Sequence, residues 1–311
     1  MTILPIDKDY DVDGIAWNGS ELVASLSRTD LLPGEYRLHR IDPADGSILG
    51  KREPDRDDCQ RLDEAGPANA DGRLAWTFNC LLPIPGLHRR IEILTAADLE
   101  GEATVLSSVR TSLSARGLDI HGDTILTSYG SRTCETLGRL GATDIEPVSI
   151  AVSGPGGEFN TADRMTGADC IGTGVALHPA TGEHGTLAFL ASTLAIGLDG
   201  PARLETPFEV YVVDPNESVA RSLGVALANV SELTWTPDGT SILASGDGAD
   251  GAGVWRIDPS TGRADRVLDF SLQSISWSDA GDRLVAMRAP EGDDELAIVI
   301  IETASLSAAT N

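Results

Sequence analysis

An all-β fold of repeated four-stranded antiparallel sheets is predicted for this chain of 311 residues by three observations. Apolar residues alternate or run in fours, and Gly, Pro, Asp and Asn interrupt them about every 8–12 residues. A pattern of short strand, glycine-containing turn and second apolar strand recurs about every 40 to 60 residues. A third and a fourth strand follow most copies. Radial repetition of such sheets leaves only short edges, so we predict a six-bladed β-propeller of four-stranded antiparallel blades.

The pattern is clearest in two segments toward the C-terminus, which read LTWTPDGTSILA at residues 233–244 and ISWSDAGDRLVA at residues 275–286. Looser copies start near residues 14, 68, 117 and 174. Trp17, Trp235 and Trp277 occupy equivalent positions in the first strands of their copies. Large aromatic side chains dominate buried packing, so we expect these three to pack between blades.

The remaining strands follow each copy in order. We expect third strands at residues 36–41, 89–94, 147–152, 208–213, 253–257 and 295–301, and fourth strands at residues 47–51, 103–107, 159–165, 220–224 and 263–269. The sixth copy lacks a clear fourth strand. Residues 2–6 could supply it and close the ring, with residues 305–308 as the alternative. No low-complexity linker divides the sequence, so residues 1–311 are expected to form a single domain.

Two segments carry a family resemblance. WTPDGTSILA at residues 235–244 and VWRIDPSTG at residues 254–262 resemble the repeat of TolB-like, or WD40-like, bacterial six-bladed β-propellers. The resemblance is clear in residues 231–301 and degenerate earlier, and the Gly-His and Trp-Asp dipeptides of true WD40 repeats are absent. It implies a propeller fold and an extracytoplasmic interaction role, and it brings no catalytic residues.

Composition narrows the function classes. The chain has 48 Asp and Glu against 23 Lys and Arg, a net charge of −25, which argues against binding a nucleic-acid backbone. No apolar run is long enough to span a membrane as a helix. The first residues lack the features of a signal peptide, so an extracytoplasmic chain would have lost its leader or anchor. We expect a monomer in the periplasm, at the cell surface or outside the cell.

Strand order places short turns and long loops at opposite ends of a propeller. Turns between first and second strands, such as Asn18-Gly19 and Pro237-Asp-Gly239, define what we call the turn end. Irregular loops at residues 28–35, 80–88, 129–146 and 192–207 define the loop end. Binding residues usually lie in irregular loops on a rigid scaffold, so we expect the working face at the loop end.

All four cysteines map to the loop end, which favours two disulfides. Pairs Cys59–Cys80 and Cys134–Cys170 would each pin a loop to a link between blades, although four cysteines allow three connectivities. Each bond would stabilise the fold by about 3 kcal/mol through the unfolded state. Four buried free thiols in a cytosolic protein are the alternative.

A polar site is expected at the channel mouth, where the first strands begin. The residues aligned there are Asp13, Asn69, Arg116, Thr173, Ser231 or Glu232, and Gln273. Convergent polar groups in a central cavity can hold a polar ligand. Alternatively, these residues bond to one another and to trapped water.

One acidic segment suggests a metal. Asp9, Asp11 and Asp13 alternate before Gly14, as at the start of an EF-hand calcium loop. Ser20 stands where such a loop needs a bidentate Glu, so a solvated acidic link competes with the calcium hypothesis. We interpret a second acidic stretch at residues 247–251 as a Gly-rich turn. No other cofactor is expected.

Catalytic motifs are scarce. The five histidines, which lack ligand-like spacing and are expected at the surface, are His39, His88, His121, His178 and His184. No Gly-x-Ser-x-Gly nucleophile elbow occurs. The sequence favours a non-enzymatic binding or scaffold propeller that engages a protein or a polar ligand through its loop end. Two alternatives remain. One is a channel-mouth hydrolase or lactonase, with or without a metal, in which Asp13, Asn69 and Glu232 are the candidate metal ligands or general base. The other is the sensor domain of a membrane-anchored receptor.

Overall fold

The computed structural model confirms the all-β fold class. It describes residues 1–7, 9–28, 36–52, 61–70, 72–84, 87–111, 114–121, 124–130, 149–153, 159–161, 170–179, 186–192, 194–195, 203–204, 207–214, 220–288 and 296–307. Contacts group the chain into two compact units, which are described separately: unit 1 is Met1–Ser112 with Leu272–Asn311, and unit 2 is Leu113–Ser271. None of the described helices is both long and apolar enough to cross a membrane.

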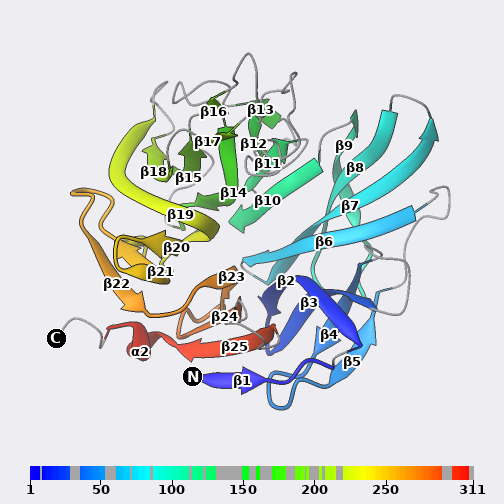
Figure 1. The fold of residues 1–311 in the computed structure, drawn as a ribbon. Helices are drawn as coiled ribbons and strands as arrows, with labels where there is room; N and C mark the ends of the chain where they lie inside the picture. The colour runs from blue at the N-terminus through cyan, green and yellow to red at the C-terminus, as the bar shows by residue number, and fades with distance from the viewer. Residues whose placement is uncertain are drawn as a thin grey trace. The chain divides into compact units, whose positions relative to one another are not determined.

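Unit 1 holds three four-stranded antiparallel sheets (Figure 1). The first consists of β2 (Tyr10–Asn18), β3 (Glu21–Arg28), β4 (Arg37–Ile41) and β5 (Ile48–Lys51). The second consists of β6 (Arg61–Ala70), β7 (Arg73–Ile84), β8 (Leu87–Ala96) and β9 (Thr104–Thr111). The third consists of β23 (Leu272–Trp277), β24 (Arg283–Arg288), β25 (Ala297–Glu302) and β1 (Thr2–Leu4).

Unit 2 repeats this plan with one shared strand. One sheet consists of β10 (Ser114–His121), β11 (Thr124–Gly130), β12 (Ser149–Ser153) and β13 (Phe159–Thr161). A seven-stranded sheet runs through β14 (Cys170–Leu177), β15 (Leu187–Ser192), β18 (Phe208–Val213), β19 (Arg221–Trp235), β20 (Ile242–Gly248), β21 (Gly251–Ile257) and β22 (Ala264–Leu268). The long, curved β19 (yellow-green in Figure 1) is the fourth strand of one set and the first strand of the next. A small hairpin, β16 (Leu194–Ala195) and β17 (Arg203–Leu204), lies within the expected loop at residues 192–207.

The N-terminal strand completes the third sheet of unit 1. β1 pairs with β25 in antiparallel register, with Thr2 opposite Ile300 and Leu4 opposite Ile298. Leu4 is buried between this sheet and the β2–β5 sheet. The alternative that residues 305–308 form the missing strand is wrong, because Thr303–Ser307 forms the short helix α2.

The tryptophans of the repeat fill the cores between sheets. Trp17 has no exposed surface and lies in a cluster with side chains of β1, β3, β24 and β25. Trp235, 4% exposed, belongs to a cluster that joins the two halves of the seven-stranded sheet. Packing between blades is therefore confirmed for these two, whereas Trp277 is only half-buried.

Turns after the third strands are closed by local hydrogen bonds. In the turn that starts at Asp258, Gly262 N–H donates to the Asp258 carbonyl at 2.8 Å, and Gly262 takes a positive φ of 73°. The Asp258 carboxylate accepts from the Ser260 hydroxyl at 2.6 Å and from the Ser260 backbone at 2.8 Å. These bonds favour the ionised form, so the pKa of Asp258 falls to about 2.

Two histidines make packing contacts with aromatic rings. His39 in β4 is 7% exposed, with its ring edge-on to Tyr10 and Nδ1 2.8 Å from the Arg37 carbonyl. Burial disfavours the imidazolium and lowers the pKa of His39. The surface prediction is wrong for this residue. His178 lies edge-on to Trp235, with Nε2 3.0 Å from the Gly239 carbonyl.

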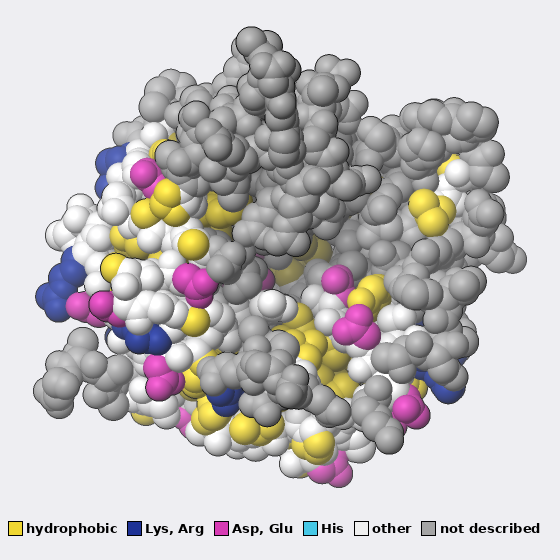
Figure 2. Space-filling view, in the orientation of Figure 1, with side chains coloured by type: hydrophobic (Ala, Val, Ile, Leu, Met, Phe, Trp, Pro, Cys, Tyr) yellow, Lys and Arg dark blue, Asp and Glu magenta, His cyan; other side chains and the backbone are white. Residues whose placement is uncertain are grey.

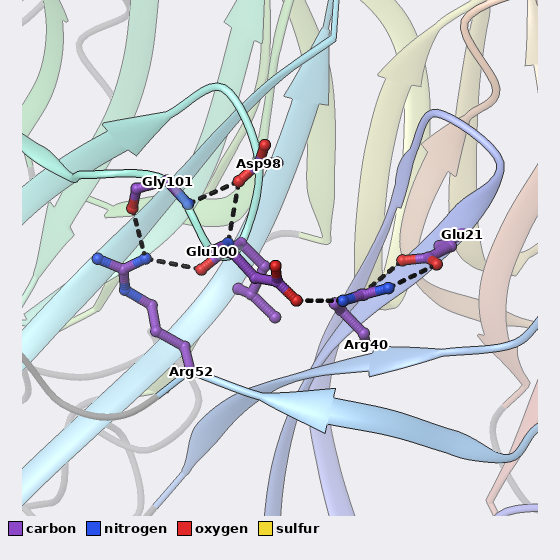
Figure 3. A network of polar contacts seen from close by, with 7 residues as sticks. Glu21, Arg40, Arg52, Asp98, Glu100 and Gly101 are labelled. Atoms are coloured by element: carbon purple, nitrogen blue, oxygen red, sulfur yellow. Dashed lines mark hydrogen bonds and ion pairs between the residues drawn. The ribbon is translucent and has the colours of Figure 1, made fainter.

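A polar network joins two sheets of unit 1 (Figure 3). Arg40 in β4 binds Glu21 of β3 through two nitrogens, at 2.6 and 2.8 Å, and also contacts Glu100 in the loop between β8 and β9. Arg52, which follows β5, donates to the carbonyls of Leu99 and Gly101 at 2.7 and 3.0 Å. The guanidinium of Arg52 also lies 5.0 Å from the centre of the Trp76 ring.

Candidate functional site

In every four-stranded set the first strand shifts register against the second, and these irregularities, which include β-bulges, are called bulges. Register shifts lie between Val12 and Gly14 in β2, Ala65 and Ala68 in β6, Ala115 and Gly117 in β10, Ile171 and Val175 in β14, Ala228 and Glu232 in β19, and Gln273 and Ser276 in β23. A bulge breaks the ladder locally and re-aims side chains, and bulges are common beside active sites. The six bulges therefore mark one recurrent position for a site.

Most of the predicted channel-mouth residues lie at these bulges. Asp13, Arg116, Thr173 and Ser231 fall within the shifted segments of β2, β10, β14 and β19, Glu232 follows the last of these, and Gln273 precedes the bulge of β23. Side-chain positions are described for Asp13, which is exposed, and for Glu232 and Gln273, which are half-buried.

Asn69 does not lie at a bulge. It pairs with Leu74 one residue before the last pair of the β6–β7 hairpin, and so sits at the turn end of β6. Its Nδ2 donates to Oδ1 of Asp279, in the turn after β23, at 3.2 Å. The structure therefore does not bring Asn69 together with Asp13. The corresponding bulge of β6 is Gly66-Pro67, which the repeat alignment missed.

Three bulges meet within unit 1. Ser274 Oγ in the β23 bulge lies 2.7 Å from Ile15 N, whose N–H it accepts, and 3.2 Å from the Ile15 carbonyl oxygen, to which it donates. Gly14 packs so closely against the β6 bulge that an added Cβ would lie 3.0 Å from Gly66 Cα. Ser274 has a φ of 50°, the one positive φ of a non-glycine residue in the described chain. Such a conformation costs about 1–3 kcal/mol and often marks a functional site.

Serine hydroxyls hold the seam between these first strands. Ser276 Oγ accepts from Trp17 N–H at 3.2 Å, two residues along from the contact between Ser274 and Ile15. The edge of β2 that faces away from β3 is therefore bonded to side chains of β23. This leaves Asp13 and Gln273 on adjoining strands at one end of the seam, where they offer a carboxylate and an amide, while the Ser274 hydroxyl is bonded to Ile15.

The aspartates of the calcium hypothesis are separated by local structure. Asp9 lies in a turn, where its N–H donates to Asp7 Oδ1 at 3.1 Å. Asp11 accepts from the Tyr36 hydroxyl at 2.8 Å and from Val12 N–H at 3.0 Å. The bulge at Asp13 breaks the strict alternation that would align all three. Among the described residues, no three His, Cys, Asp or Glu side chains are grouped so as to hold a metal ion.

The second acidic stretch is a tight turn. Gly248 pairs with Gly251 at the end of the β20–β21 hairpin, and Asp247 pairs with Ala252. Trp255 packs over Gly248. The interpretation of residues 247–251 as a Gly-rich turn is confirmed.

One of the four cysteines is described with its side chain. Cys80 in β7 has no exposed surface and is not a free thiol. Its register partner is Leu62, which follows Cys59 by three residues. Cys170 begins β14 opposite Ser192, and Cys59 and Cys134 lie outside the described residues. The two pairings stay predictions.

Comparison with known proteins gives structural likeness alone. No protein-family model matches the chain. A search of curated proteins gives no match either. TolB from Acinetobacter baumannii has a TM-score of 0.52 at 14% identity, covering 95% of this chain and 67% of its own.

Two matches span nearly the whole of both chains. An α-L-arabinanase from Penicillium chrysogenum, solved with arabinobiose, has a TM-score of 0.62 at 10% identity and covers 99% of each chain. An α-L-arabinofuranosidase from Fusarium graminearum, solved with an iminosugar inhibitor, has a TM-score of 0.58 at 14% identity and covers 97% of this chain and 96% of its own. This chain has a β-propeller fold. At these identities the likeness extends to the fold and not to activity.

Proposed function

We propose that this protein is an extracytoplasmic, non-enzymatic binding propeller that engages a polar ligand at the loop end of its first strands. The observation that supports this most is the bulge found in each first strand, at the position where the sequence predicts polar residues. Bulges re-aim side chains and are over-represented beside active sites. The resemblance of residues 231–301 to TolB-like repeats supports the extracytoplasmic assignment.

The chemistry at the unit 1 bulges favours a neutral, polyhydroxylated ligand. Asp13 offers an exposed acceptor, and Gln273 offers both a donor and an acceptor. A net charge of −25 disfavours polyanions such as nucleic acids. Oligosaccharides fit this combination, and arabinobiose, the sugar bound by the structurally similar arabinanase, is a practical first probe.

Calorimetric titration of the full chain with arabinobiose, and then with a set of neutral and uronic oligosaccharides, tests the proposal. We expect one neutral sugar to bind, and Asp13→Ala and Gln273→Ala to weaken its Kd by about tenfold or more. Asn69→Ala is the matched control, because Asn69 lies at the turn end. No heat with any sugar, or equal affinity in all variants, would refute the proposed site.

A hydrolase is the second candidate function. The full-length likeness to an arabinanase and an arabinofuranosidase, together with the exposed Asp13 carboxylate at a bulge, favours it. Chromatography of arabino-oligosaccharides after long incubation separates the two functions. Shortened products that disappear with Asp13→Asn would establish hydrolysis, whereas unchanged sugar together with measurable binding supports the binding protein.

The disulfide pairs Cys59–Cys80 and Cys134–Cys170 belong to the same proposal. The register that sets Cys80 opposite Leu62 brings the chain just after Cys59 beside Cys80, which supports the first pair. Peptide mapping of the unreduced protein tests both pairs. Four alkylated cysteines under denaturing, non-reducing conditions would contradict the extracytoplasmic assignment as well.

A further inference from the structure

One ionisable side chain, His39, lies where two sheets of unit 1 pack together. Its register partner on β3 is Ala24, and register partners in an antiparallel pair share one face of the sheet. Ala24 and Ile41, which lies two residues along β4 from His39, both belong to the cluster that packs the β2–β5 sheet against β1, β24 and β25. His39 therefore lies on the side of its sheet that meets the third sheet of unit 1. This contact between the two sheets is called here the closing joint.

The imidazole of His39 has little access to water. Only 7% of the residue is exposed, and its ring lies edge-on to Tyr10 of β2, with ring centres 5.7 Å apart. Tyr10 itself packs against the cluster of the closing joint. Acidic and basic side chains, but no histidine, are seen on the described surface in Figure 2. Placing a charge in such a position is costly unless an opposite charge accompanies it.

The hydrogen bond of His39 determines which nitrogen can take up a proton. Nδ1 lies 2.8 Å from the Arg37 carbonyl oxygen. A carbonyl oxygen can only accept, so Nδ1 carries the hydrogen and donates it. The lone pair of the neutral ring is then on Nε2. Protonation at Nε2 would turn the ring into a cation inside the closing joint.

Cations, rather than carboxylates, surround the ring. Lys51 is directly opposite His39 on β5, and Arg37 lies two residues before it on the same face of β4. Arg28, at the end of β3, is the register partner of the tyrosine that His39 contacts. On the third sheet, the Arg283 guanidinium lies over a tryptophan ring of the closing joint. A protonated His39 would therefore add a further positive charge to this region.

The carboxylates near the closing joint have other surroundings. Asp11, next to Tyr10 in β2, points to the opposite face of its strand and accepts from the Tyr36 hydroxyl at 2.8 Å. Asp9 is exposed in the turn before β2, and Glu302 is exposed at the end of β25. Burial lowers the pKa of His39 from its ordinary 6.5, the bond to the backbone of residue 37 opposes this, and the charges of residues 51 and 37 add to it. No carboxylate is among these causes.

We propose that His39 is an acid-sensitive switch in the closing joint: a proton taken up at Nε2 loosens the packing of β4 and β1 between the two sheets. Because the pKa of His39 is lowered, stabilisation by the neutral ring is complete above about pH 6.5 and is lost as the pH falls below that value. Carboxylates with ordinary pKa values stay mostly ionised down to about pH 5, so the switch acts before general acid denaturation. It does not depend on the proposed ligand.

Hydrogen exchange of the full chain, followed by mass spectrometry from about pH 7.5 to about pH 5.5, tests the switch. After correction for the intrinsic pH dependence of exchange, we expect peptides from β1 and β4 to lose protection as the pH falls. Peptides from β7 and β8 of the second sheet should keep theirs. His39→Gln retains a donor for the carbonyl but cannot take up a proton, so it should abolish the loss. His178→Gln, the matched control in unit 2, should lose protection in β1 and β4 as the parent does.

NMR titration of the His39 ring in the parent is a second test that needs no substitution. We expect the ring to titrate below pH 6.5, over the range in which β1 and β4 lose protection. Several results would overturn the proposal: a loss of protection that persists in His39→Gln, an equal loss in β7 and β8, or a ring that titrates while β1 and β4 stay protected. An equal loss in all sheets would assign the acid response to the carboxylates of the whole protein.

Discussion

The two ends of the first strands are built in different ways. At the turn end, hydrogen bonds join residues close in sequence: Asp238 accepts from Thr236 at 2.6 Å and from Thr240 N–H at 3.0 Å. Ser278 and Asp282 make a similar pair at 2.7 Å. At the bulge end, Ser274 bonds to Ile15, 259 positions away. The turn end is thus held mainly by local bonds, with the bond between Asn69 and Asp279 as a longer-range contact, whereas the bulges of unit 1 contact one another across separate repeats.

This difference separates scaffold from function. Local turns can form early and are insensitive to the rest of the molecule, so they suit a repeated frame. The bulges of unit 1 include the strained backbone of Ser274 and the close approach of Gly14 to Gly66. Contacts with the neighbouring strands are needed to maintain both features. The loss of unfolding free energy caused by a substitution should therefore depend on whether the residue lies at the turn end or at the bulge end.

The largest effect is expected between the two ends, where Trp17 fills the core. Trp17→Ala would remove a fully buried ring over which the Arg283 guanidinium lies at 4.5 Å, and should lower the free energy of unfolding by about 3–5 kcal/mol. Urea denaturation followed by circular dichroism measures it. A loss below about 1 kcal/mol would mean that the sheets of unit 1 are not held by this core.

Gly14→Ala probes the close approach of two bulges. The new methyl would lie 3.0 Å from Gly66 Cα and 3.2 Å from Pro67 Cδ, so we expect a loss of about 1–3 kcal/mol in urea denaturation. Gly50→Ala on β5 is the matched control, because nothing lies within 4 Å of its added Cβ. Equal stability of the two variants would show that the bulges of β2 and β6 do not meet.

Substitutions at Ser274 separate its hydrogen bonds from its backbone strain. Ser274→Ala loses the bonds to Ile15 and keeps the positive φ, so it should cost about 1–2 kcal/mol. Ser274→Gly also loses the bonds but tolerates that φ, and should be more stable than the Ala variant by about 0.5–1 kcal/mol. Chemical denaturation of both proteins checks the order, and an Ala variant at least as stable as the Gly variant would argue against strain at this bulge.

The smallest effect is expected in a turn. The pKa of Asp258, about 2 in the folded chain against an ordinary 3.8, is depressed, so its contribution is complete above about pH 4 and is lost as the pH falls toward 2. Asp258→Asn should lower Tm slightly at neutral pH, and the difference from the parent should vanish near pH 2. Thermal melts across this range measure it, and a difference that does not change with pH would contradict the local account.

Features determined by local sequence could be predicted, whereas features that depend on a partner strand could not. The turns and the alternating strands have local signals, such as Pro237-Asp-Gly239, and the structure has them. Of residues 2–6, one of the two segments considered for the missing strand, Thr2–Leu4 pairs with the last sheet. The bulges were not predicted, since a register shift depends on the partner strand. One signal was available: Gly66-Pro67 inside a strand pattern is typical of a bulge. With this signal, the candidate site position in the second repeat would have been Gly66-Pro67 rather than Asn69. Burial of His39 was also missed, because it depends on Tyr10 in another strand.

The pairing of β1 with β25 has a consequence for how the molecule is made. Thr2 and its register partner Ile300 are separated by almost three hundred residues of sequence, so this pairing cannot form until nearly all of the chain between them has been synthesised. Before β25 is synthesised, therefore, β1 has no partner strand and the β23–β25 sheet is incomplete. Until β25 has been synthesised, the backbone groups of β1 that later pair with it are available for pairing with other chains.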